Sequence, residues 1–236
     1  GRRSRPRRLV RRRHPTWPQP HRPAGLQVTV TPTVARRTAA AFVSGRWGQT
    51  DRPVVELTTP TGHAVCFQYL QTAMAMLARD LGDEVLRDIT EAAWEELVLG
   101  HLFVNGGTGA LAGVEGFGAT YDLDPEQAYS ETCASLAGVF WNRELGLLTG
   151  AARHDDLLEW QLLNGVAVGT SADGTAYHYN NPLQVLPGLE RRSWYPIPCC
   201  PSNLSRTWAS LATLQWSRQG EELRLHQFFS SAVELA

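Results

Sequence analysis

Three of the four cysteines in this 236-residue chain lie in two short segments whose side chains could bind a metal together. Cys199 and Cys200 are adjacent in "IPCCPSN", between two prolines, and Cys133 follows Glu131 by two residues in "YSETCASLAG". One carboxylate and three thiolates make a four-coordinate set of the kind that zinc prefers. The prolines restrict the backbone of the pair, so less ordering entropy would be lost on binding. Glu131, Cys133, Cys199 and Cys200 are therefore candidate zinc ligands.

Two other interpretations of these cysteines stay open on the residues alone. The sequence contains no CxxC motif, and 65 residues separate Cys133 from Cys199. Buried, unreactive cysteines are common in protein cores, and the adjacent pair could also form a vicinal disulfide. Cys66 stands beside Phe67 on an apolar helical face, and we expect it to pack in the core.

The spacing of Glu131 and Cys133 restricts where they can converge. Residues i and i+2 point to different faces in the middle of a helix, so both can reach one point only at a helix start or in a loop. Ser130 is a suitable N-cap, which places Cys133 in the first helical turn. The helix dipole favours a thiolate there.

Three further residues could take part in chemistry, although each has a simpler explanation. Glu115 lies in the glycine-rich loop "GVEGFG", where a carboxylate can approach a ligand closely, yet a solvated loop acid is the default. His63 follows "TG" just before a helix, where a capping or structural histidine is expected. Tyr179, in "HYNNPL", is unremarkable by itself.

The elements that must position these residues are mainly helical. Apolar residues recur at steps of three and four, which is typical of helices; the sets are Phe67, Leu70, Met74 and Leu77, then Leu86, Ile89, Ala93 and Leu97, and later Leu204, Trp208, Leu211 and Leu214. "DPEQAYSETCASLAGVFWNRELGLL" and "HDDLLEWQLLNGV" predict two more helices. A β-like run, "LQVTVTPTV", precedes them, and strand-like alternation returns in "ELRLHQFFSSAVEL". Antiparallel helix pairs joined by long glycine-bearing loops predict an all-α fold with functional loops at one end.

The charge is divided unevenly along the chain. Residues 1–25 contain nine arginines and no acid, while the remaining thirteen basic residues face all 23 acidic ones. The body is therefore not a general polyanion binder, and we expect the Arg/Pro-rich head to be disordered. Such a head could hold nucleic acid or an acidic surface, but aromatic residues are not interleaved in it. No apolar run reaches the ~18 residues that a membrane span needs.

Together these segments resemble glycoside hydrolase family 127, the β-L-arabinofuranosidases. The matching pieces are "GHAV" at 62–65, "GGTG" at 106–109, "EGFGATYDLDPEQAYSETCAS" at 115–135, "YNNPL" at 179–183 and "CCPSNLSR" at 199–206. Their order and spacing agree with the family over about residues 55–236, and "ETCAS" followed by "CCP" is a highly specific combination.

The resemblance implies a role for each matched residue. Glu131, Cys133, Cys199 and Cys200 match zinc ligands, and Cys199 also matches the catalytic nucleophile. Glu115 matches the general acid/base, and His63 and Tyr179 match residues that line the sugar site. The implied activity is a retaining glycosidase in which a thiolate replaces one of the two usual carboxylates.

The resemblance also implies a fold, which this chain covers in part. The family has an (alpha/alpha)6 barrel followed by β-sandwich domains. We expect residues 1–25 to be the disordered head, 26–218 part of the barrel, and 219–236 the start of a β-sandwich domain. The sequence begins at Gly1 and family members are several hundred residues longer, so we expect a partial chain. Where the family usually has arginine after "GHAV", this chain has Cys66.

The expected partner is an arabinofuranoside-containing oligosaccharide or glycoconjugate, with no membrane contact. The composition disfavours nucleic acid, and the oligomeric state cannot be read from the sequence. Reduced metal-binding cysteines and the lack of a secretory signal favour a cytoplasmic location. Two rival functions remain: a catalytically inactive zinc-binding remnant of the family, and a binding protein that uses its Arg-rich head.

Overall fold

The computed structural model describes residues 53–184 and 187–232. The expected disordered head and the β-like run at 26–34 lie outside these residues. Within them the fold is helix-rich with a small two-stranded sheet, as the sequence predicts. The main helices are α2 (Ala64–Leu81), α3 (Glu84–Gly100), α4 (Thr132–Thr149), α5 (Ala152–Gln161) and α6 (Cys199–Ala209).

Short helical segments and one hairpin complete the described part. The short segments are η1 (Val54–Glu56), η2 (Leu162–Val166, a π-helical turn), η3 (Ala167–Gly169) and η4 (Leu211–Leu214). Strands β1 (Trp216–Gln219) and β2 (Glu222–Leu225) pair antiparallel, with Trp216 opposite Leu225 and Gln219 opposite Glu222. The hairpin agrees with the expected strand character near the C-terminus, and the fold with part of an (alpha/alpha)6 barrel. The domain limits stay a prediction.

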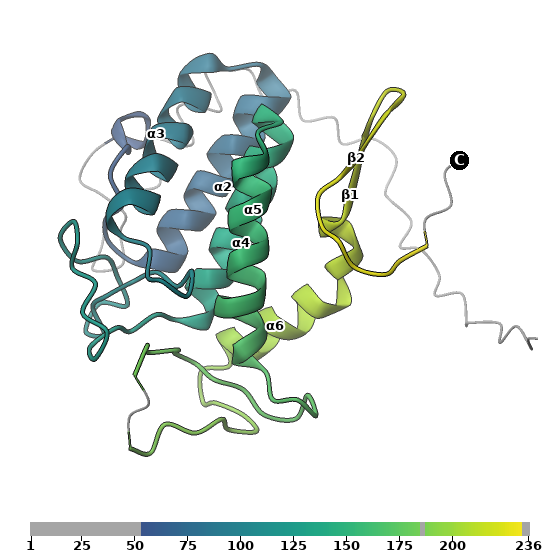
Figure 1. Cartoon of the computed structure of the whole chain (residues 1–236). Helices are drawn as coiled ribbons and strands as arrows, with labels where there is room; N and C mark the ends of the chain where they lie inside the picture. The colour runs from purple at the N-terminus through teal and green to yellow at the C-terminus, as the bar shows by residue number, and fades with distance from the viewer. Residues whose placement is uncertain (1–52, 185–186, 233–236) are drawn as a thin grey trace, which may run out of the picture. The chain divides into compact units, whose positions relative to one another are not determined.

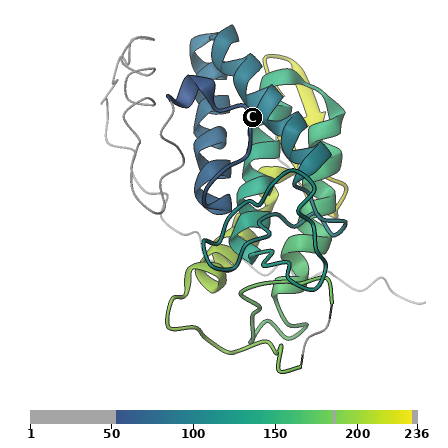
Figure 2. The same ribbon diagram turned by 90° about the vertical axis from the view of Figure 1, so that its left-hand side faces the viewer.

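The helices alternate in direction, and this alternation places three helix starts at one end. Figure 1 shows α2, α3, α4 and α5 side by side, with the loop segments 101–131, 170–184 and 187–198 at the end where α2, α4 and α6 begin. Figure 2 shows the same gathering of loops from a second side. No helix among the described residues is long and apolar enough to cross a membrane.

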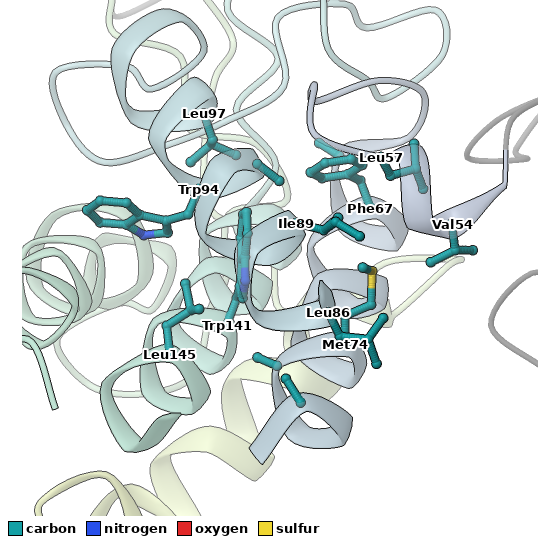
Figure 3. Packing of buried hydrophobic residues seen from close by; sticks show 14 of the residues in the cluster. Val54, Leu57, Phe67, Met74, Leu86, Ile89, Trp94, Leu97, Trp141 and Leu145 are labelled. Atoms are coloured by element: carbon teal, nitrogen blue, oxygen red, sulfur yellow. The ribbon is translucent and has the colours of Figure 1, made fainter. Parts of the chain in front are cut away.

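The main core lies among α2, α3 and α4. Figure 3 shows Phe67 and Met74 of α2, Leu86 of α3 and Trp141 of α4 packed together. The predicted apolar faces of α2 and α3 are those that are buried, and helix packing of this kind rather than propensity supplies most helical stability. A second cluster joins α4, α5, η2 and α6 around Leu136, Leu158, Val166 and Leu204.

Cys66 contradicts the sequence expectation. Phe67 is fully buried, but the preceding residue points about 100° away around the helix, and Cys66 is exposed. It is not a core residue. Its thiol faces the charged end of the fold: partial desolvation and then the negative charges of Glu131 and Glu115 raise its pKa.

Candidate metal and catalytic site

The candidate site is built on the first turns of three helices. Cys199 and Cys200 are the first two residues of α6, Cys133 is the second residue of α4, and His63 is the N-cap of α2. The predicted helix around Leu204 therefore begins earlier than its apolar spacing indicates, and it ends at Ala209 before a separate 3-10 turn. Unpaired N–H groups and the positive end of the dipole favour anionic sulfur at such positions.

The N-cap of α4 differs from the prediction by one residue. Glu131, not Ser130, occupies the cap, and it makes no side-chain cap hydrogen bond. Glu131 is extended and pairs with Asn180 in an isolated bridge, and the Tyr179 carbonyl accepts from Thr132 N at 2.8 Å. The neighbouring chain thus satisfies the first backbone donor of the helix, which leaves the Glu131 carboxylate available to the site. Cys133 still lies in the first turn, as predicted.

The structure brings the four predicted metal ligands together. One ligand atom from each of Glu131, Cys133, Cys199 and Cys200 lies within 4.8 Å of the others. Oε1 of Glu131 is 3.4 Å from Sγ of Cys200 and 3.7 Å from Sγ of Cys199. The two adjacent sulfurs are 3.9 Å apart and free, so they form no vicinal disulfide. Two sulfurs bound to one tetrahedral zinc at ~2.3 Å each would be about 3.8 Å apart.

The burial and charge of Glu131 also favour a bound cation in this site. Glu131 is 2% exposed, and its Oε2 has no hydrogen-bond partner among the described residues. Burial, and then the charges of Cys199 and Glu115, raise the pKa of Glu131 to about 8. A buried carboxylate without a full set of partners is costly, and a metal ion would remove that cost. The residues present can hold a metal ion.

The three thiols differ in their acidity. Hydrogen bonds from Cys133, Cys200 and Tyr179 lower the pKa of Cys199 to about 2. The bond to Cys199 raises the pKa of Cys133, and burial raises that of Cys200. Negative charge therefore concentrates on Cys199, which is also the half-buried member of the pair, whereas Cys200 is fully buried. Of the three, Cys199 is best placed to act as a nucleophile.

Glu115 is held beside this cluster in a left-handed backbone conformation, with φ of 50°. Its carbonyl accepts from Ala64 N at 3.0 Å, which ties the loop to the start of α2. Gly116 must be glycine, because a Cβ there would lie 2.4 Å from the Gly62 carbonyl oxygen. Strained backbone of this kind is frequent at functional sites.

Two side chains hold the two carboxylate oxygens of Glu115. His63 Nε2 lies 3.1 Å from Oε2, while its Nδ1 accepts from Cys66 N at 3.3 Å. With Nδ1 accepting, a neutral His63 carries its proton on Nε2 and donates it to Glu115. His63 is thus both the expected cap and a site residue. Ligand atoms of His63, Glu115 and Glu131 lie within 4.8 Å of one another.

Tyr179 contacts both cysteines of the adjacent pair. Its hydroxyl is 3.1 Å from Sγ of Cys199. Its backbone carbonyl lies 3.5 Å from Sγ of Cys200. All predicted site residues therefore meet at this end of the fold, while their roles stay predictions.

Tyr129 is the site residue that the sequence reasoning missed. Its hydroxyl donates to Oε1 of Glu115 at 2.7 Å, and burial followed by that bond raises its pKa. Its ring centroid is 6.5 Å from that of Tyr179. Ser130, which separates it from Glu131, has a left-handed φ of 40°, so no strand or helix periodicity marks Tyr129 as a site residue.

The family model for the β-L-arabinofuranosidase GH127 catalytic domain matches residues 23–213. The chain belongs to glycoside hydrolase family 127. A relative, the non-reducing end β-L-arabinofuranosidase of Bifidobacterium longum, is 33% identical over an alignment of 208 residues, which covers 83% of this chain and 32% of that protein.

Solved GH127 structures agree with the fold. A GH127 β-L-arabinofuranosidase from Geobacillus stearothermophilus T6 matches with a TM-score of 0.74 and 36% identity, over 77% of this chain and 30% of that one. A second GH127 β-arabinofuranosidase matches with a TM-score of 0.77 and 33% identity, over 83% and 31%. The chain spans about a third of the length of these relatives.

Proposed function

We propose that this chain carries the catalytic centre of a retaining glycosidase that releases L-arabinose from β-L-arabinofuranosides. The observation that carries the proposal is that Glu131 belongs to two groups of converging side chains. One group contains the three cysteines and the other contains His63 and Glu115. In this proposal the nucleophile comes from the first group and the acid/base from the second, and both lie close to one buried carboxylate.

Cys199 is the nucleophile in this proposal. Its thiolate attacks the anomeric carbon of the arabinofuranoside, and the bond to the leaving oxygen breaks as a glycosyl-thioether forms. The Tyr179 hydroxyl lies at Sγ and steadies the thiolate before attack. The thiolate takes the role of nucleophile that a second carboxylate has in ordinary retaining glycosidases.

Glu115 supplies and removes the proton. In the first step its carboxylic acid protonates the leaving oxygen, and in the second its carboxylate takes a proton from the water that cleaves the thioether. Tyr129 and His63 each hold one oxygen of the group, so its orientation is fixed in both steps.

Zinc is the metal that the donor set favours. Glu131, Cys133, Cys199 and Cys200 would hold it, because a thiolate-rich set suits zinc better than harder cations. When bound, zinc would keep the coordinating thiols deprotonated at neutral pH. Two successive displacements at the anomeric carbon, the first by Cys199 and the second by water, retain the configuration.

The experiment is a turnover assay of the purified chain with 4-nitrophenyl β-L-arabinofuranoside, with the anomer of the released sugar followed by NMR. We expect release of the β anomer first, and a loss of at least ~1,000-fold in kcat/KM for Cys199→Ser. Release of the α anomer first would reject the retaining mechanism. No turnover by a folded, zinc-loaded chain would favour the inactive remnant.

A further inference from the structure

A second set of reactive side chains lies at the opposite end of the helices. His226 Nε2 is 2.6 Å from Oγ of Ser217, and His226 Nδ1 is 3.0 Å from Oδ2 of Asp155. The imidazole thus connects a serine hydroxyl to a carboxylate through its two nitrogens. This is the connectivity by which serine hydrolases activate a nucleophile, and it is recognised by geometry rather than by fold.

The local fold holds these three residues firmly. Ser217 is opposite Arg224 in the hairpin, and His226 N donates to the Gln215 carbonyl at 2.7 Å, so Ser217 and His226 share one face of the ribbon. Asp155 comes from the first turn of α5. A Cβ on Gly146 of α4 would lie 3.0 Å from Oδ1 of Asp155, so glycine leaves room for the carboxylate.

Ser217 opens onto a cleft of about 670 Å³. The cleft lies between the ends of α2 and α4, the start of α3, and the hairpin; its lining includes Arg79, Arg87, Arg143, Trp216, Ser217 and Arg224. His226 is almost fully buried behind it. The lining residues 147–150 follow Cys133 by four turns of α4, which is about 20–25 Å along the helix. The cleft is therefore separate from the cysteine site.

Arg143 gives the cleft a cation beside the serine. Its Nη2 donates to the Trp216 carbonyl at 2.8 Å, and that carbonyl belongs to the peptide bond that precedes Ser217. Nη1 of the same guanidinium is buried and has no hydrogen-bond partner among the described residues. Other arginines of the lining are engaged, Arg87 with Glu91 and Arg224 with Glu222. Arg143 therefore places a positive charge next to the backbone of Ser217.

We propose that Ser217, His226 and Asp155 form a second nucleophilic site, which transfers acyl groups from small esters to water, with Arg143 beside the reacting carbonyl. The arginine-lined cleft selects esters whose acyl group carries a carboxylate. The site is independent of the glycosidase centre.

The proposed ester hydrolysis takes two steps and needs no cofactor. Ser217 Oγ attacks the ester carbonyl carbon, its proton passes to His226 Nε2, and the carbonyl π electrons move to the oxygen. The tetrahedral centre collapses, the C–O bond to the alcohol breaks, and His226 returns the proton to the departing alkoxide. Water then attacks the acyl-serine by the same sequence and releases the acid and free Ser217. Asp155 orients the imidazole and offsets its positive charge.

The test uses the purified 236-residue chain in two assays. A fluorophosphonate probe reports an activated serine through labelled-peptide mass spectrometry, and 4-nitrophenyl hemisuccinate and 4-nitrophenyl acetate report turnover. Ser217→Ala is the main variant, and Ser231→Ala is the matched control, since Trp216 Nε1 lies 3.3 Å from the hydroxyl of this nearby serine, which has no part in the relay. Asp155→Asn tests the third member, and circular dichroism checks folding of each variant.

We expect the label on Ser217, faster turnover of the hemisuccinate than of the acetate, and a loss of at least ~100-fold in Ser217→Ala and Asp155→Asn but not in Ser231→Ala. An unlabelled Ser217 in the folded wild type would overturn the proposal. Turnover that is unchanged in Ser217→Ala would do the same, because it would show that the hydroxyl only bonds the histidine.

Discussion

The hydroxyl of Tyr129 donates a 2.7 Å hydrogen bond to Oε1 of Glu115, while His63 holds Oε2 of the same carboxylate. Each oxygen of the proposed acid/base therefore has one fixed partner. Glu115 sits in a loop, where side chains are otherwise free to change rotamer. The two contacts, together with the backbone tie to Ala64, let a loop residue reach the precision that catalysis needs.

Tyr129→Phe should lower kcat/KM by about 10- to 100-fold, because a hydrogen bond to a charged group is worth ~1.5–3 kcal/mol. Zinc content should not change, since Tyr129 is not among the predicted ligands. Tyr121→Phe is the control, because Tyr121 lies in the same loop region and is 73% exposed. A change of less than twofold in Tyr129→Phe would show that the bond does not position Glu115.

Gly116→Ala should displace the Glu115 loop. The added Cβ would collide with the Gly62 carbonyl at 2.4 Å, so the backbone that joins the loop to α2 must move. We expect at least a ~10-fold loss of kcat/KM, since small displacements in an active site are costly. Gly113→Ala in the same loop is the matched control, because nothing lies within 4 Å of its Cβ. Equal activity of the two variants would argue against the loop's role.

The metal site can be tested by elemental analysis. We expect about one zinc per chain in the wild type and almost none in Cys200→Ala, together with a lower Tm, because metal-binding energy contributes to folding. Cys66→Ala controls for the loss of a thiol, since Cys66 is exposed and lies outside the ligand group. A wild type without zinc, or a Cys200→Ala variant that retains it, would contradict the assignment of the ligands.

The sequence could predict the helices because they depend on short-range pattern. Phe67, Met74 and Leu86 are buried as their spacing requires. The residues near Glu131 and Cys199 suggested a metal site but left other interpretations open, and the resemblance to family 127 favoured their convergence, which the structure shows.

Other features could not be predicted because they depend on contacts between distant segments. Ser130 looks like an N-cap locally, but pairing of Glu131 with Asn180 moves the helix start by one residue. Cys66 fits an apolar run, yet its exposure depends on which elements lie against α2. The bond between Tyr129 and Glu115 requires a loop closure that no periodicity encodes. The relay from Ser217 to Asp155 joins residues 62 positions apart.

His154 provides a test of stability against pH. It is fully buried, its ring meets Trp94 edge-on at 4.5 Å, and neither ring nitrogen has a hydrogen-bond partner among the described residues. Burial, and then the charge of Arg153, lower its pKa to about 4. The unfolded chain has a histidine pKa of about 6.5 and therefore binds this proton first as pH falls.

The sign of the effect follows from this order. Well above pH 6.5, protonation of His154 does not change the free energy of unfolding. As pH falls toward 4, the unfolded chain binds the proton that the buried ring does not, so the free energy of unfolding decreases progressively, by about 2 kcal/mol at pH 5. His154→Phe removes the titrating group, so its Tm should fall less than that of the wild type between pH 7 and pH 5. Equal decreases in both proteins would show that His154 is not buried in its neutral form.

The most direct test of the central claim is to trap the sugar on Cys199. In Glu115→Ala, 4-nitrophenyl β-L-arabinofuranoside can still react because its leaving group needs no acid, whereas hydrolysis of the thioether lacks its base. We expect the intact protein to gain the mass of one pentosyl group, with the modification on the peptide that contains Cys199. A pentosyl group on Glu131 instead, or the absence of any adduct while nitrophenol is released, would contradict a cysteine nucleophile.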